Sequence, residues 1–175
     1  LDGALCLRDL LEGSTPAAAR LRAGVEEVRL TGDLHGLPAI IVHGRADALV
    51  PVNHTSRPYT ALNKAVERGR SRLSYIEVTN AQHFDAFIGL PALLGGYDTR
   101  FVPLHVYLLR ALDAMYDHLR HNKPLPASQV VRTVPRGGTP GAAPPLTAAN
   151  VPPIAITPAP GDAITMVGTT LRVPE

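Results

Sequence analysis

The 175 residues, 45% hydrophobic and 18% charged, fit one folded domain with or without a tail and exclude a disordered chain. A net charge of +2, with no basic run interleaved with aromatic residues, excludes a nucleic-acid partner. The single cysteine, Cys6, excludes an internal disulfide framework and a cysteine-based zinc site.

Two helices are expected to open the chain. The first covers the leucine-rich residues 5–11 and ends at Gly13. The second begins at Thr15-Pro16, where a hydroxyl can cap the helix and proline suits its first turn, and it ends at Gly24.

A strand–helix–strand–helix pattern follows. The run Pro38–Val42 lies between two glycines and is continuously apolar, as is typical of a parallel strand buried on both faces. Residues 53–68 predict a helix, 73–78 a second buried strand, and 104–118 an amphipathic helix with an apolar stripe. That stripe consists of Leu104, Leu108, Leu112 (or Leu109) and Met115. The predicted fold class is therefore α/β, with parallel strands flanked by helices and further strands upstream.

Residues 122–175 differ from residues 1–121 because they hold 11 of the 17 prolines. We expect an exposed linker at 133–145 and a tail whose short strands pack back onto the body. Those strands are expected at 154–156, 164–167 and 170–173. No membrane span is predicted, since the longest uncharged run, 137–161, carries seven prolines.

The first residue is leucine and the only methionines are Met115 and Met166, so we expect a processed form or a fragment. No signal peptide is visible.

An acid and a base follow the two predicted strands. Asp47 comes three residues after the glycine that ends the first strand, and His83 comes shortly after the second, thirty-six residues later. Neighbouring parallel strands end at the same edge of a sheet, so Asp47 and His83 are predicted to meet there. An aspartate that accepts from an imidazole fixes its tautomer and stabilises the imidazolium formed in proton transfer.

A nucleophile does not accompany this pair. None of the five serines stands in G-x-S-x-G, and Cys6 has no glycine turn around it. In α/β-hydrolases the order along the chain is nucleophile, acid, base, so the serine is expected upstream. On its own the segment is predicted to be inactive.

Three segments resemble the C-terminal part of the D-(−)-3-hydroxybutyrate oligomer hydrolases: HGRADALVPV (43–52), AQHFDAF (81–87) and LPALLGGYDTRFVPLHVY (90–107). The resemblance covers nearly the whole chain. It implies that residues 1–121 are the end of an α/β-hydrolase catalytic domain and that residues 122–175 are its Pro-rich tail. It also implies a serine esterase acting on 3-hydroxybutyrate dimers and oligomers, with Asp47 and His83 as acid and base. The implied partners are that ester substrate and the upstream part of the enzyme; no cofactor is implied, and the compartment would be secreted or periplasmic, with the cytoplasm as alternative.

Other residues have weaker claims. Phe84 could line an acyl pocket and Arg100 could bind a substrate carboxylate, although packing and surface ion pairs compete as explanations. Arg57 has the same two readings as Arg100, and Asp85 is an alternative acid. The non-catalytic alternatives are a core histidine with its hydrogen bonds satisfied for His43, and ordinary loop residues for Asp47 and His83. A metal site using His54 and His105 lacks ligand spacing.

Two rival functions stay open. One keeps the fold and changes the reaction, to a tannase-like esterase, a thioesterase or a peptidase. The other is a non-catalytic α/β module whose prolines, at 152–153 or 158–160, dock a partner. A distance between the Asp47 carboxylate and the His83 ring within hydrogen-bond reach would favour the enzyme.

Overall fold

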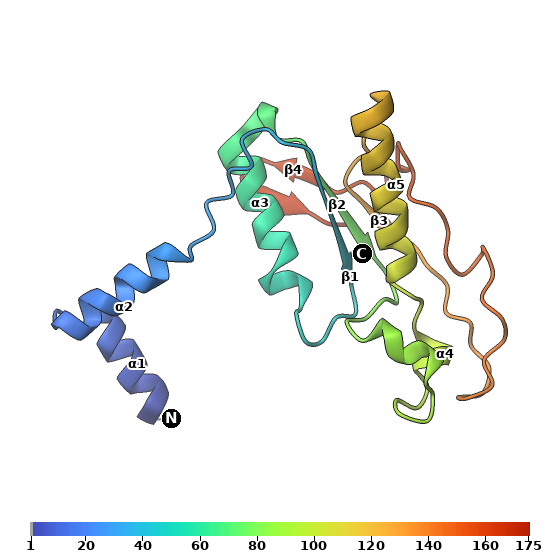
Figure 1. Ribbon diagram of the computed structural model, residues 1–175, viewed down its shortest axis with the longest axis horizontal. Helices are drawn as coiled ribbons and strands as arrows, with labels where there is room; N and C mark the ends of the chain where they lie inside the picture. The colour runs from blue at the N-terminus through green and yellow to red at the C-terminus, as the bar shows by residue number, and fades with distance from the viewer. Residues whose placement is uncertain (1) are drawn as a thin grey trace. The chain divides into compact units, whose positions relative to one another are not determined.

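The computed structural model describes residues 2–175, which form two compact units, one ending at Thr31 and one spanning Gly32–Glu175 (Figure 1). In the second unit the elements are β1 (Ala39–Gly44), α3 (Ser56–Glu67), β2 (Leu73–Val78), α4 (Tyr97–Arg100), α5 (His105–His121), β3 (Gln129–Val131), β4 (Thr165–Val167) and β5 (Thr170–Arg172). Short 3-10 helices cover Val52–His54, Arg68–Arg70 and Asp85–Gly89. Within residues 2–175, no helix has the length and apolar character needed to cross a membrane.

The first unit consists of α1 (Asp2–Glu12) and α2 (Pro16–Glu27), close to the two predicted helices. Thr15 caps α2 as expected, its hydroxyl accepting the N–H of Ala18 at 3.2 Å. The predicted stop at Gly24 is wrong, because α2 continues to Glu27. Glycine inside a helix costs only about 1 kcal/mol relative to alanine, which is too little to end a helix by itself.

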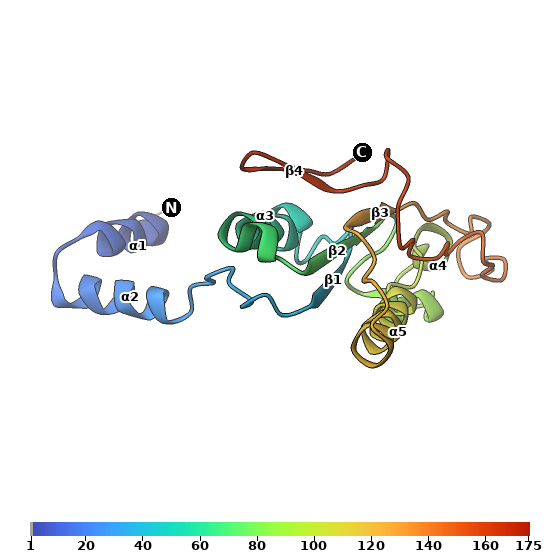
Figure 2. The same ribbon diagram turned by 90° about the horizontal axis from the view of Figure 1, so that it is seen from above.

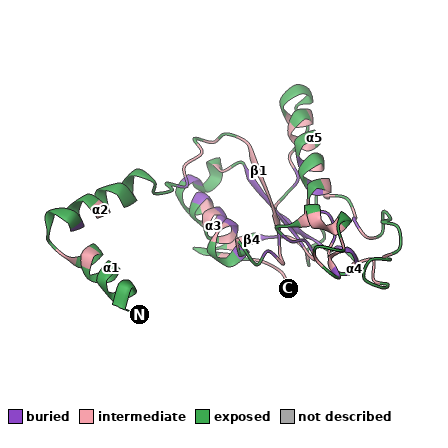
Figure 3. Cartoon of the chain, turned by 60° about the horizontal axis from the view of Figure 1, so that its bottom comes forward, coloured by how far each residue is buried: buried purple, intermediate pink, exposed green. Residues whose placement is uncertain are grey.

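The sheet of the second unit has the order β1-β2-β3, with both pairs parallel. The predicted α/β class with parallel strands and flanking helices is confirmed. The central strand β2 is buried at all six positions, whereas β1 is half-buried at five of six. The prediction that the first strand is buried on both faces is therefore wrong for this chain, because β1 lies at an edge of the sheet. Figure 3 shows the buried residues gathered around the strands and the outer faces of the helices exposed.

Alternate side chains of β2 serve two cores, as the pleat requires. Ile76 and Val78 pack with Tyr107 of α5 on one face. Tyr75 packs with Ile164 and the partly buried Leu171 on the other face. Figure 2 shows the same layers, with α5 on one side of the sheet and α3 and the β4–β5 hairpin on the other.

The helix predicted at 104–118 is confirmed as α5, and its predicted contact stripe is confirmed at Leu104, which packs against the core, but is wrong at Leu108 and Leu112. Tyr107 and Ala111 are the buried residues of α5, whereas Leu108 and Leu112 are 53% and 57% exposed. The spacing identified an amphipathic helix, yet no other described residues cover its leucines.

The Pro-rich tail contributes directly to the sheet through β3, a strand that the sequence analysis missed. The hairpin β4–β5 confirms two of the predicted tail strands, but 154–156 is not a strand. Instead, the side-chain amide of Gln129 donates to the Ala155 carbonyl at 2.6 Å and accepts the Ala155 N–H at 3.0 Å. One side chain thereby replaces a neighbouring strand as hydrogen-bond partner.

The predicted linker 133–145 is not free along its whole length. Thr133 is buried, Arg136 donates to the Asp98 carbonyl at 2.9 Å, and the Gly137 N–H donates to the Thr99 carbonyl at 3.0 Å. These bonds tie the start of the segment to α4, since prolines remove donors only at their own positions.

Candidate active site

The carboxyl ends of β1 and β2 lie side by side, because Gly44 and Val78 are paired in register. The loop after β1 is then fixed by two backbone hydrogen bonds, one to the last residue of β2 and one to the loop that follows β2. The Arg45 N–H donates to the Val78 carbonyl at 2.7 Å, and the Ala46 N–H donates to the Ala81 carbonyl at 3.0 Å. The two loops are thus in contact before any side chain is considered.

Glycine at position 44 permits this contact. A Cβ atom there would lie 2.5 Å from the Ala81 carbonyl oxygen and 3.0 Å from the Gln82 nitrogen. Both are backbone atoms and cannot swing aside, so any side chain at position 44 has to push the loops apart. In the sequence, Gly44 marks the end of the predicted strand, and a glycine at the end of a β-rich run is also a signal of close backbone approach.

Alanine at position 44 is expected to destabilise the protein by about 1–3 kcal/mol, the usual cost of forcing atoms into a packed site. Urea unfolding of the complete protein measures this. Gly69→Ala is the matched control, since a Cβ at Gly69 meets nothing within 4 Å, and it is expected to change stability by less than about 0.5 kcal/mol. Equal stability of the two variants would contradict the close-approach argument.

The structure brings Asp47 and His83 together at this sheet edge. Asp47 Oδ2 lies 3.1 Å from His83 Nδ1, while Oδ1 accepts the N–H groups of Leu49 at 2.9 Å and Val50 at 2.8 Å. Burial alone would raise the pKa of Asp47, but the hydrogen bonds from the two amides and from His83 outweigh it and hold the pKa below its usual value. The carboxylate is therefore ionised at neutral pH and suited to accept from an imidazole N–H.

The two members of this pair differ in exposure. The Asp47 side chain is only 4% exposed, whereas the His83 side chain is 41% exposed. With Nδ1–H donating to Asp47, Nε2 carries the lone pair, and among the described residues it has no hydrogen-bond partner. The arrangement can accept a proton at an open nitrogen and stabilise the resulting charge with a buried carboxylate.

His43, near the end of β1, contacts the loop that carries Asp47. Its Nε2–H donates to the Val50 carbonyl at 2.9 Å and lies 3.5 Å from Asp47 Oδ2. The ring is 13% exposed. These contacts agree with the expectation of a satisfied histidine and not of a proton carrier.

Asp85 is occupied away from His83. Its Oδ2 accepts the backbone N–H of His105 at 2.8 Å and lies 3.0 Å from His105 Nδ1, at the first turn of α5. The acid that contacts His83 is therefore Asp47, and Asp85 connects the loop after β2 to α5.

The two predicted substrate contacts lie in different surroundings. The Phe84 ring packs edge-on against His83, with centroids 5.2 Å apart, and is 40% exposed beside the pair. Arg100 donates to the carbonyls of Gly96 and Gly95, at 3.1 and 3.4 Å, and its guanidinium lies over the Phe101 ring. Within residues 2–175, Arg100 makes no hydrogen bond or ion pair with Asp47 or His83.

The family profile described as 3HB-oligomer hydrolase matches residues 1–175, the full chain. The chain belongs to the 3HB-oligomer hydrolase family.

Relatives in this family are similar over the full length of the chain. Three proteins named D-(-)-3-hydroxybutyrate oligomer hydrolase are 69% identical (Paracidovorax citrulli), 62% identical (Azoarcus sp.) and 59% identical (Cupriavidus necator). The matches cover 99–100% of this chain but only 24–25% of each relative, so the chain spans about a quarter of their length. No solved structure matches the chain significantly.

In this member of the family, Asp47 and His83 are hydrogen-bonded to each other, and no nucleophile is bonded to them. Among residues 2–175, no serine, threonine or cysteine side chain hydrogen-bonds to His83. Nor do three or more His, Cys, Asp or Glu side chains in that range gather as a metal would require, so His54 and His105 form no such group.

Proposed function

We propose that the chain supplies the acid and base of a Ser-Asp-His triad in an esterase that hydrolyses 3-hydroxybutyrate dimers and oligomers. The observation that carries the proposal is the hydrogen bond from His83 Nδ1 to the buried Asp47 carboxylate, with Nε2 open. Membership of the 3HB-oligomer hydrolase family supports the substrate class.

In the proposed reaction His83 Nε2 takes the proton of a serine hydroxyl from another part of the enzyme as the serine oxygen bonds to the ester carbonyl carbon. When the ester bond breaks, His83 returns this proton to the departing alkoxide oxygen, which leaves as the hydroxyl group of the neighbouring unit. A water molecule then attacks the acyl-enzyme with the same help from His83 and releases the 3-hydroxybutyrate product. Asp47 stays ionised throughout and stabilises the imidazolium.

Substrate contacts are also part of the proposal. The half-exposed ring of Phe84 lies against His83 and offers an apolar surface for the methyl-bearing acyl unit. Arg100 is proposed to meet the terminal carboxylate of an oligomer, as a more distant contact. The oxyanion donors, like the serine, would come from outside this chain.

The tail gives no support to the rival binding module. The Pro152 carbonyl accepts from the Tyr107 hydroxyl at 3.0 Å and from the Arg110 guanidinium at 2.7 Å. These two hydrogen bonds hold the Pro152 backbone against α5, so that this part of the tail is bound within the chain.

The complete protein is expected to release 3-hydroxybutyrate from the linear dimer ester and to react with a serine-directed phosphonate, whereas the 175-residue chain alone should do neither. Chromatographic detection of the monomer and mass spectrometry of the labelled peptide measure both. If the complete protein cleaves peptide or thioester substrates but not the dimer, the proposed substrate is wrong. If it neither cleaves the dimer nor reacts with the phosphonate, the proposed serine-esterase activity is wrong.

A further inference from the structure

A carboxylate lies buried in the middle of the central strand. Glu77 of β2 has a side chain with 0% exposure, on the sheet face covered by α3 and the tail hairpin. An ionised carboxylate cannot be kept there without partners, because removing it from water is costly.

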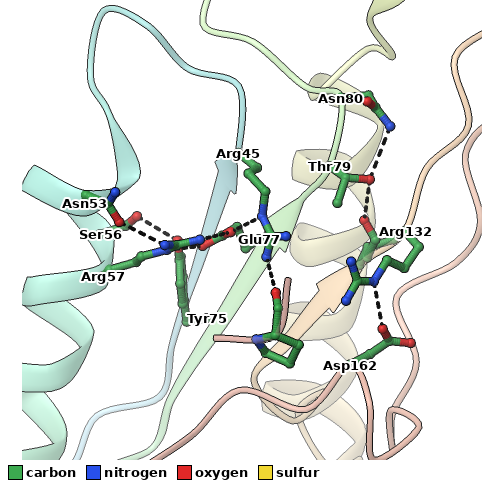
Figure 4. A network of polar contacts seen from close by, with 12 residues as sticks. Arg45, Asn53, Ser56, Arg57, Tyr75, Glu77, Thr79, Asn80, Arg132 and Asp162 are labelled. Carbon is green, nitrogen blue, oxygen red and sulfur yellow. Dashed lines mark hydrogen bonds and ion pairs between the residues drawn. The ribbon is translucent and has the colours of Figure 1, made fainter. Parts of the chain in front are cut away.

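Glu77 is satisfied by two arginines and a tyrosine. Arg57 of α3 donates from Nε to Oε2 at 2.8 Å and from a terminal nitrogen to Oε1 at 2.6 Å, and the Tyr75 hydroxyl donates to Oε2 at 2.7 Å. Arg45 Nε donates to Oε1. Burial on its own would raise the pKa of Glu77, but these charge-assisted bonds lower it, so the cluster holds one anion and two cations (Figure 4).

Arg45 connects this cluster to the candidate active site. It follows β1 directly and precedes Asp47 by two residues. Its side chain reaches Glu77 and, through a terminal nitrogen, the Pro174 carbonyl at 2.8 Å (Figure 4). Its backbone N–H meanwhile binds the Val78 carbonyl at the end of β2. The residue therefore fastens the start of the Asp47 loop to the central strand and to the C-terminal segment at once.

We propose that Arg45 is a positioning residue for the reaction: anchored on Glu77 and Pro174, it holds the loop that places Asp47 against His83. The inference rests on the proposed function, because it gives the anchor a catalytic consequence. His83 must present Nε2 to a nucleophile from another part of the enzyme, and a misplacement of 1 Å in such a site costs about 100-fold in rate. Arg45 acts through Asp47 and needs no contact with substrate.

Arg45→Met in the complete enzyme is the decisive variant. Methionine keeps much of the apolar stem but donates no hydrogen bond, and Glu77 retains its two bonds from Arg57, so the buried charge stays paired. We expect kcat to fall about 10- to 100-fold with KM within about twofold of wild type. Arg45→Lys keeps the positive charge but not the forked geometry of the guanidinium, so its kcat should lie between those of the wild type and Arg45→Met.

Arg132→Met is the matched control. Arg132 also donates from Nε to a carboxylate, that of Asp162 at 2.9 Å, but it follows β3 and has no contact with the Asp47 loop (Figure 4). Its kcat should stay within about twofold of wild type. Rates are expressed per active site, titrated with the serine-directed phosphonate, so that loss of folded protein is not counted as loss of catalysis.

A double-mutant comparison separates positioning from a purely structural role. If Arg45 acts through Asp47, Arg45→Met should have little further effect on kcat in an Asp47→Asn background. Full kcat per active site in Arg45→Met, or the same fold-loss in both backgrounds, would overturn the inference while leaving the esterase intact. Wild-type kcat in Asp47→Asn alone would instead overturn the proposed function.

Discussion

Replacing His83 with alanine in the complete enzyme is expected to lower kcat on the 3-hydroxybutyrate dimer by about 10⁶-fold, the loss typical when the base of a triad is removed. His83 offers the open Nε2, and alanine leaves no group there to take the proton of the nucleophile. Initial rates at saturating dimer, per mole of folded enzyme, measure the effect. KM should change little, because the imidazole acts mainly in the transition state.

His105→Ala is the control for this variant. His105 is bonded to Asp85 through Nδ1 at 3.0 Å, much as His83 is bonded to Asp47, and it is 62% exposed. Its kcat should remain within about twofold of wild type, since Asp85 can still cap α5. A large loss in His105→Ala together with an active His83→Ala would mean that the base had been assigned to the wrong pair.

Asparagine at position 47 is expected to lower kcat by about 10⁴-fold, as when a triad aspartate is made neutral without changing its shape. The amide oxygen of asparagine can still accept the N–H groups of Leu49 and Val50, so the loop should be kept. The amide nitrogen would face His83 Nδ1 as a donor and favour the wrong tautomer. The loss is measured as kcat on the 3-hydroxybutyrate dimer at several pH values from neutral to alkaline.

Asp33→Asn provides the comparison. Asp33 likewise accepts a backbone N–H, that of His35 at 2.8 Å, and lies 3.5 Å from the His35 ring. It precedes β1 and does not belong to the loops that follow the strands, so its kcat should match wild type. Comparable losses in both variants would indicate a general effect of charge and not the orientation of His83.

The pairing of Asp47 with His83 could be predicted because it follows from topology. Two strands joined by a helix, β1 and β2, lie in parallel, and their carboxyl ends then share one edge. The strand at 73–78 was also predicted to the residue, because a six-residue segment with aromatic and β-branched side chains is typical of a buried strand.

Features that depend on distant segments could not be predicted in this way. The three-residue strand β3 is too short to leave a periodic signal, and it forms because β2 offers its second edge. The sequence predicted that Arg57 is a surface ion-pair residue or a ligand for the substrate, but in the structure its side chain points from α3 to Glu77. Whether a charged side chain is buried depends on what folds over it, and local sequence does not contain that information.

The uncovered apolar surface of the second unit has a thermodynamic consequence. Ile40, Ile41 and Val42 of β1 are half-buried, and Leu108 and Leu112 of α5 are more than half exposed. The hydrophobic free energy of these side chains is realised in full only when another part of the enzyme excludes water from them. Under the proposed function, a part of the enzyme that covered these side chains would raise the free energy of unfolding of the segment.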